Sequence, residues 1–353
     1  MLDLHFKNEM TGKGPILECV PNFSEGRDTA KINAIAEAIR SVQGVHLLHI
    51  DSSPSAHRTV MTFAGEPAAV TEAAYQAIRT AGNIIDMTKQ QGVHPRIGAT
   101  DVCPLVPLSG LGMEGAVAWS KRLGERVGEE LGVPVYLYEH SAAHDHRRAL
   151  PDIRKGQYEK FAEKMKLAEW RPDYGPSEFV ANTGAMVLGA RDVLVAFNIS
   201  LKTNEVKHAT YIADRIRERG YTEKIDGKKS KIPGLLPKLR AIGWYMEDFH
   251  SAQVSMNLLD YRITSPLKVW EGTNALAEII GVEVIGCEVV GLIPESCLLE
   301  AGAFTYLKKQ EQPPEDKELL VHAAIEHLKL DKVKPFDPQE KVLEYALKRE
   351  GLI

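Results

Sequence analysis

The chain has 353 residues, of which 44% are hydrophobic and 26% are charged, and its formal net charge is −5. This length predicts two domains or lobes, and the mild negative charge gives no support for nucleic-acid binding. No apolar run approaches the roughly 20 residues of a membrane-spanning helix, and the N-terminus lacks the pattern of a secretory signal. We therefore expect a cytoplasmic protein that binds neither nucleic acid nor membrane.

The first half alternates between strand and helix patterns. A polar N-terminal extension is expected over residues 1–15. Strands are predicted at 16–21, 45–50, 58–63, 102–108 and 133–138, and helices at 29–42, 66–85, 113–131 and 153–170. The opening order of strand, helix, two strands, helix and strand matches the ferredoxin-like βαββαβ unit. The proline- and glycine-rich residues 171–184 are interpreted as a connecting segment.

The second half repeats this order. Strands are predicted at 193–201, 238–248, 251–263 and 284–293, helices at 204–219 and 267–280, and further helices from Glu295, Glu315 and Pro338. Residues 222–234 are interpreted as a charged loop. We predict an α+β fold of two ferredoxin-like lobes, at 16–179 and 180–330, whose facing sheets enclose a substrate cleft or tunnel. A helical tail is expected at 331–353.

The stretch "QQGVHPRIGATDVCPLVPL" carries a histidine that is a candidate for acid–base chemistry. Pro95 restricts His94 to extended backbone, while Gly92 and Gly98 permit tight turns on either side. A titratable ring on such a braced loop is suited to proton transfer. A capping or core histidine is the alternative at this point.

Two other polar segments lie between predicted elements. Residues 51–60 offer Asp51, His57 and Arg58, although a hairpin connection explains the same residues. "VPNFSEGRD" offers Asn22, Ser24, Glu25 and Arg27, although capping of the next helix explains much of it. The motifs G-x-S-x-G, G-x-G-x-x-G after a strand and Walker A are absent, which excludes the commonest hydrolase, dinucleotide and kinase interpretations.

No metal site is expected. His140, His144 and His146 are the best candidates, and His140 and His144 would share a face if their segment were helical. The segment is charged, however, and is interpreted as a solvated loop. The four cysteines are scattered without zinc spacing, which is typical of buried thiols in a reducing compartment.

Eight ordered motifs resemble the formiminotransferase domain of the glutamate formimidoyltransferases. The resemblance runs from about Ile16 to Leu330. It is carried by "ECVPNFSEGRD", "QGVHPRIGATDVCPLVPL", "LGVPVYLYE", "DYGPSEFVANTGA", "GARDVLVAFNISL", "AIGWYMED", "AQVSMNLLDYRIT" and "GLIP". It departs from the family at Val93 and at Gln90–Gln91, where an acidic residue and a histidine are frequent, and at His57, where asparagine is common.

The resemblance implies transfer of a formimidoyl group from N-formimidoyl-L-glutamate to N5 of tetrahydrofolate, a step of histidine degradation that releases L-glutamate and 5-formimidoyltetrahydrofolate. It implies two lobes whose sheets face a substrate tunnel, tetrahydrofolate as co-substrate, and His94 as the catalytic histidine. It places the folate-binding loop at Gly175, Pro176, Ser177, Glu178, Phe179, Val180, Ala181, Asn182, Thr183 and Gly184.

This chemistry explains the residue types. One group with a pKa near 7 can take a proton from the attacking nitrogen and return it to the departing one, and histidine is suited to this role. Guanidinium groups bind the carboxylates of both substrates, so Arg58 and Arg96 are candidate clamps. Asp51 and Asp101 are candidate orienters of His94 or pterin contacts. A cap or turn contact is an equally good interpretation of Asp101.

Two other functions stay open on the sequence. One is a related tetrahydrofolate-dependent formyl or one-carbon transferase with another donor, and the other is a folate-binding protein without activity. We expect a homodimer. Some family members carry a cyclodeaminase domain on the same chain, and here we expect the cyclodeaminase to be a separate protein.

Overall fold

The computed structural model describes residues 14–225 and 227–353, so most of the predicted polar extension lies outside the described residues. The described chain forms two compact units. The N-terminal unit comprises residues 14–192 with 349–353, and the C-terminal unit comprises residues 193–348. We expected the first lobe to end at residue 179, and the units divide between Asp192 and Val193. Both units combine sheets with helices, in agreement with an α+β fold.

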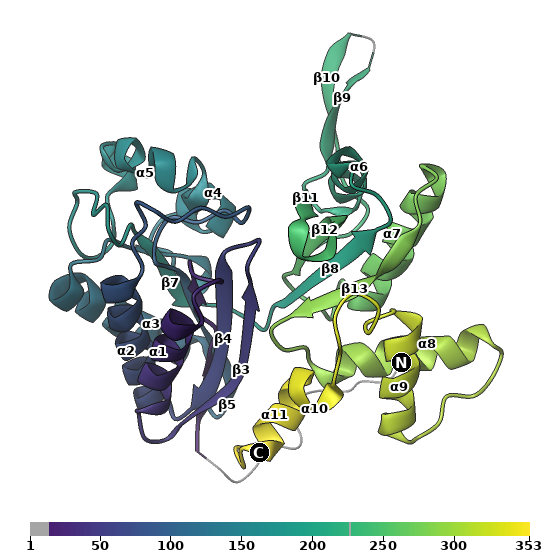
Figure 1. The fold of residues 1–353 in the computed structure, drawn as a ribbon, viewed down its shortest axis with the longest axis horizontal. Coiled ribbons are helices and arrows are strands. Elements are labelled where there is room, and N and C mark those ends of the chain that lie inside the picture. The colour runs from purple at the N-terminus through teal and green to yellow at the C-terminus, as the bar shows by residue number, and fades with distance from the viewer. Residues whose placement is uncertain (1–13, 226) are drawn as a thin grey trace. The chain divides into compact units, whose positions relative to one another are not determined.

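The N-terminal unit is built on one sheet of the described strands (Figure 1). Strand β4 pairs with β3 on one side and with β1 and β2 on the other. Strands β1 and β2 share one place between β4 and β5, and β7 lies between β5 and β6. The strands are β1 (Ile16–Cys19), β2 (Asn22–Phe23), β3 (Val45–Ser53), β4 (Arg58–Gly65), β5 (Thr100–Ser109), β6 (Val135–Leu137) and β7 (Met186–Ala190).

Three amphipathic helices cover one face of this sheet: α1 (Thr29–Arg40), α2 (Pro67–Ile84) and α3 (Met113–Leu131). Their apolar residues pack with Met61 and Phe63 of β4 and with Cys103 and Leu105 of β5 in one core. Because side chains alternate across a strand, Arg58 at the start of β4 lies on the opposite face from Met61 and Phe63. The helix and strand predictions for this region are confirmed to within a few residues at their ends.

A second, smaller core lies on the other face of the sheet. Val102, Tyr136 and Val187, from three neighbouring strands, pack there against Phe161 and Met165. We predicted one helix over 153–170, which is wrong. The chain forms α4 (Leu150–Arg154), α5 (Gln157–Met165) and a 3-10 turn at Ala168–Trp170. Gly156, with φ of 94°, breaks the helix because a left-handed residue cannot continue it.

Strand β7 was not predicted. Its sequence, "MVLGA", is buried at every residue, and it pairs in parallel with both β5 and β6. A parallel strand that is buried on both faces has no alternation of polar and apolar residues, so it lacks the usual sequence signal. The strand follows residues 171–184 and fixes the end of that segment beside β5 and β6.

The C-terminal unit has an antiparallel sheet in the order β11-β12-β8-β13. The chain order β8, α6, β11, β12, α7, β13 is the predicted one. The elements are β8 (Val195–Leu201), α6 (Val206–Ile216), β11 (Leu239–Met246), β12 (Ser251–Leu258), α7 (Pro266–Ile279) and β13 (Val284–Val290), with a 3-10 turn at Glu247–Phe249. That each lobe is ferredoxin-like stays a prediction, as does the cleft between facing sheets.

The loop predicted at 222–234 is in fact a β-hairpin. Strands β9 (Tyr221–Ile225) and β10 (Lys228–Ile232) pair with each other and form a separate two-stranded sheet, which projects beyond α6 in Figure 1. Most of the described hairpin side chains are at least partly exposed. The strands therefore need no apolar face, and the pattern that identifies a strand is missing.

The remaining helices pack beside the second sheet. They are α8 (Glu295–Lys308), α9 (Lys317–His327), α10 (Pro338–Lys341) and α11 (Leu343–Arg349). Leu298, Ile325 and Val342 join the core of β8 and β13, so the predicted tail is part of this unit's core. Among the described helices, none is both long and apolar enough to cross a membrane.

Candidate active site

The loop that carries His94 rests on the turn between β3 and β4. The amide of Val93 donates to Ser55 O at 3.3 Å, and the Gln90 side chain donates to His57 O at 3.1 Å. Gly92 lies so close to this turn that a Cβ would be 2.4 Å from Ala56 O. Only glycine fits there without moving the backbone, so the sequence "QQGVH" is shaped for this contact.

His94 itself is half-buried, and Nδ1 lies 2.7 Å from the carbonyl oxygen of Pro95. Because a carbonyl only accepts, Nδ1 carries the proton, and Nε2 holds the lone pair of the neutral ring. Burial lowers the pKa of His94 well below 6.5, and the guanidiniums of Arg58 and Arg154 lower it further. The ring is therefore neutral at pH 7 and can accept a proton at Nε2.

Asp101 lies at the centre of a buried charge cluster beside this loop. The side chain of Asp101 is fully buried, and its Oδ2 accepts from Arg58 Nη1 at 2.6 Å and also from Arg154 Nη2. Its Oδ1 accepts from the amide of Ile97 at 2.9 Å and from Arg154 Nε at 3.3 Å. Burial alone would raise the pKa of Asp101, but Arg154 and Arg58 hold it below its ordinary value. Asp101 is therefore an anion that joins two arginines to the His94 loop.

Arg58 is held on its other edge by Asn22, whose Oδ1 accepts from Arg58 Nε at 3.0 Å. Burial lowers the pKa of Arg58 to about 10, although Asp101 acts in the opposite direction. At this value the guanidinium stays charged at pH 7. Asp51 is also buried and lies opposite Val60 in the β3–β4 register, so it shares a sheet face with Arg58.

Arg96 was a candidate substrate clamp, but protein groups occupy it. Its Nη1 and Nη2 donate to Glu159 at 2.9 and 2.6 Å, and Nε donates to Gln90 Oε1 at 2.6 Å. The side chain is 6% exposed and lies over the ring of Tyr158. These contacts fix Arg96 as a link between the His94 loop and α5.

The segment 175–184 meets the His94 loop at one end only. Thr183 O accepts from the amide of Ala99 at 2.8 Å, and Gly98 and Gly184 form a backbone bridge. A Cβ on Gly98 would lie 2.1 Å from Ala185 O, so the two backbones touch.

The middle and the start of this segment have other neighbours. Tyr158 packs against Phe179 and donates to Ala181 O at 2.7 Å. Gly175 instead packs against Gly128 of α3, and Ser177, Glu178 and Asn182 are exposed.

Glu25 and His57 also contact each other beside this loop. His57 Nε2 lies 3.0 Å from Glu25 Oε1, and His57 Nδ1 lies 2.8 Å from Gln91 O. Glu25 also accepts from the amides of Gly26, Arg27 and Asp28. Burial would raise the pKa of Glu25, but the backbone hydrogen bonds and His57 lower it.

Sequence reasoning missed Arg154 and Glu159, two partners of the predicted residues. Both belong to "PDIRKGQYEK", where charged residues are dense and the pattern is typical of a solvent-exposed segment. The only indication of such partners was indirect. If Asp101 is buried, its carboxylate requires cationic side chains from elsewhere in the chain.

The histidines at 140–146 have separate partners. His140 lies 3.3 Å from Asp192 Oδ2, and His146 Nε2 lies 2.9 Å from Glu169 O and packs on Trp170. Among the described residues, no cluster of three metal-ligating side chains is found.

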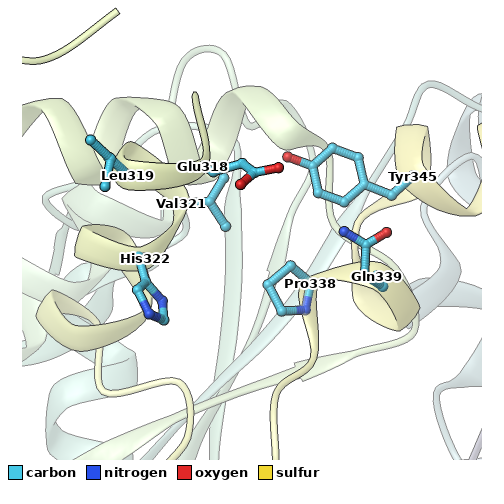
Figure 2. Close-up of a pocket in the computed structure, with 7 residues that line it drawn as sticks. All are labelled: Glu318, Leu319, Val321, His322, Pro338, Gln339 and Tyr345. Carbon is cyan, nitrogen blue, oxygen red and sulfur yellow. The ribbon is translucent and has the colours of Figure 1, made fainter. Parts of the chain in front are cut away.

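A cavity of about 330 Å³ lies in the C-terminal unit (Figure 2). It lies between α9, α10 and Tyr345 of α11, and the Tyr345 hydroxyl points toward Glu318. None of the predicted site residues lines it.

Two family models match nearly the whole chain. The N-terminal subdomain of the formiminotransferase domain matches residues 16–191, and the formiminotransferase domain matches residues 196–348. The chain belongs to the formiminotransferase family. The resemblance carried by the eight motifs is thus confirmed, and the division between the two matches agrees with that between the two compact units.

Curated relatives from distant organisms support the same family assignment. The chain is 46% identical over 337 residues to the formimidoyltransferase-cyclodeaminase of Mus musculus, covering 95% of this chain and 60% of that protein. It is 40% identical to the glutamate formimidoyltransferases of Streptococcus pyogenes and Thermoplasma acidophilum. Those matches cover 84% and 82% of this chain and 94% and 91% of the relatives. The chain thus spans about 60% of the length of the mouse relative.

Proposed function

We propose that this formiminotransferase chain transfers the formimidoyl group of N-formimidoyl-L-glutamate to N5 of tetrahydrofolate. The products are L-glutamate and 5-formimidoyltetrahydrofolate. Two relatives that carry the printed name glutamate formimidoyltransferase support this reaction, because they match this chain over more than nine-tenths of their own length.

The observation that carries the proposal is the state of His94. A neutral ring with its proton fixed on Nδ1 by Pro95 O presents Nε2 as a base. When N5 attacks the amidine carbon, a C–N bond forms and N5 loses its proton to Nε2. When the bond to the glutamate nitrogen breaks, the resulting imidazolium returns that proton to the departing nitrogen. One residue thus balances both steps.

The neighbouring charges support His94 in this role. Asp101 accepts from the Ile97 amide and so fixes the loop three residues after the ring. Arg58 and Arg154 favour the neutral ring before substrate arrives. We propose Asp101 and Arg96 as positioning residues, Asp51 and Arg58 as groups beside the reacting centre, and residues 175–184 as folate-contacting backbone. A homodimer, a cytoplasmic location and a separate cyclodeaminase stay predictions.

The test is a coupled assay on the purified full chain. With tetrahydrofolate and N-formimidoyl-L-glutamate, L-glutamate should form, whereas N-formyl-L-glutamate should give none. Turnover with the formyl donor alone would instead favour the related formyl transferase. Binding of tetrahydrofolate without turnover of either donor would favour a folate-binding protein. Dialysis against a strong chelator should leave the rate unchanged, because the proposed proton transfers need no metal.

A further inference from the structure

The cluster around Asp101 carries one positive charge in excess. Two guanidiniums, those of Arg58 and Arg154, share the single carboxylate of Asp101. Among the described residues, their remaining hydrogen-bond partner is the neutral side chain of Asn22. The side chains of Arg58 and Arg154 are only 7% and 13% exposed. A charge this sheltered is weakly screened by solvent, so it attracts an anion strongly.

Each guanidinium also keeps donors that the protein does not use. Arg154 binds Asp101 through Nε and Nη2, which leaves Nη1 without an acceptor in the described part of the chain. Arg58 uses Nε and Nη1, which leaves Nη2. Neither spare nitrogen is among the buried polar atoms that lack a partner, so both stay accessible to solvent. Charge and donors together describe a site for an oxyanion.

We propose that Arg154, together with Arg58, binds the α-carboxylate of the formimidoyl donor. This inference rests on the proposed function. In N-formimidoyl-L-glutamate, the α-carboxylate is attached to the same carbon as the reacting nitrogen. It therefore has to lie within a few ångströms of the proton-transfer group.

The carboxylates of tetrahydrofolate fit this position less well. They lie beyond the aminobenzoyl group, at the far end of the molecule from N5. The cluster is tied to the His94 loop through the hydrogen bond from the Ile97 amide to Asp101. An anion site at this place therefore favours the donor over the folate tail.

Binding of the donor carboxylate would also change the basicity of His94. Before the donor binds, the excess charge favours the neutral ring. A carboxylate on Arg154 cancels that charge and so makes Nε2 a stronger base once the reacting nitrogens are in place. Nε2 of His94 would therefore be a stronger proton acceptor with the donor bound than in the free enzyme.

The experiment compares R154Q and R154K with R148Q in the full chain. Arg148 is an exposed arginine of the same region that pairs with Asp145, so R148Q is the matched control. Calorimetry measures the binding of L-glutamate and of 4-aminobutyrate, which lacks the α-carboxylate. Fluorescence measures the binding of tetrahydrofolate, and the coupled assay gives KM and kcat for the donor.

We expect R154Q to weaken L-glutamate binding and to raise the donor KM by about 10-fold or more, as for the loss of a charged hydrogen bond. R154K should lie between R154Q and the wild type, because an ammonium cannot bind a carboxylate in bidentate fashion. Wild type should prefer L-glutamate to 4-aminobutyrate, and R154Q should lose this preference. Tetrahydrofolate binding should change less than about twofold in all variants, and R148Q should match the wild type.

The inference is overturned if R154Q keeps the wild-type preference for L-glutamate over 4-aminobutyrate. It is equally overturned if R154Q and R154K weaken tetrahydrofolate binding as much as glutamate binding, which would indicate a purely structural role. The calorimetric measurement of L-glutamate binding does not depend on turnover. A wild-type chain that binds L-glutamate through Arg154 but does not transfer the formimidoyl group would contradict the proposed function alone.

Discussion

Glu25 and His57 are joined by a hydrogen bond of 3.0 Å that ties the turn between β3 and β4 to the segment before α1. The second ring nitrogen of His57 faces the carbonyl oxygen of Gln91 at 2.8 Å. Residue 57 therefore connects the start of α1 to the segment that places the proposed catalytic ring.

Replacing His57 should loosen this connection. In H57N the shorter side chain cannot reach Glu25 and Gln91 at once, so we expect kcat to fall about tenfold and the free energy of unfolding to fall by about 1–2 kcal/mol. Tetrahydrofolate binding should stay within about twofold of the wild type. Steady-state kinetics and urea unfolding measure both effects, with H140N at an exposed histidine as control. An unchanged kcat in a less stable H57N would limit His57 to a role in folding.

Substitution of His94 is expected to have the largest effect on turnover. H94Q should lower kcat by about 10²–10⁴-fold, the usual contribution of general acid–base catalysis. Tetrahydrofolate binding should be retained, because the loop is held by backbone contacts of its neighbours. Single-turnover assays and equilibrium binding on the same preparation separate the two. Near-normal turnover in H94Q would remove His94 from the mechanism.

The pH dependence follows from the lowered pKa of His94. The neutral ring is the active base, so kcat/KM for the donor should stay level as the pH falls through 6.5 and should decline only below it. The profile of kcat reports the complex with donor, where the bound carboxylate favours the imidazolium. Its acid limb should therefore lie at higher pH. Rate profiles between pH 5 and 8 test this, and coincident limbs would argue against a donor carboxylate on Arg154.

Much of the scaffold could be predicted, because amphipathic periodicity marks α1, α2 and α3 and flanking turn residues mark their ends. A histidine braced by proline and glycine is also visible in the sequence, and its role in acid–base chemistry stays a prediction. The partners of the charged residues could not. Glu159 and Gln90 bind the Arg96 side chain, and neither contact was predicted, because pairing between distant charges leaves no local pattern.

A stability effect is expected in the C-terminal unit. Burial raises the pKa of Glu344 from 4.5 to about 7, and nearby Glu295 adds to this. A carboxyl whose pKa is raised by folding favours the unfolded state as the pH rises from 4.5 through 7, and the full cost is present above 7. E344Q should therefore stabilise the unit at pH 8 by on the order of 3 kcal/mol and by little at pH 4.5.

Thermal unfolding at both pH values measures this effect. E300Q, at an exposed position of α8, is the control. The amide oxygen of E344Q can still accept the hydrogen bond that the Glu295 amide donates to Glu344 at 2.8 Å. Equal melting shifts at pH 4.5 and pH 8 would show that Glu344 does not titrate in this range.

The late position of β7 in the sequence has a consequence for how the site is assembled during synthesis. The ribosome releases the His94 loop and β5 long before Met186–Ala190, the strand that covers the open edge of β5. Until then β5 exposes unpaired backbone groups, a template for unwanted pairing with other chains. Thr183 and Gly184 reach Ala99 and Gly98 only when β7 docks. A nascent chain is therefore expected to complete its proposed folate-contacting loop in the same step that pairs this edge of β5.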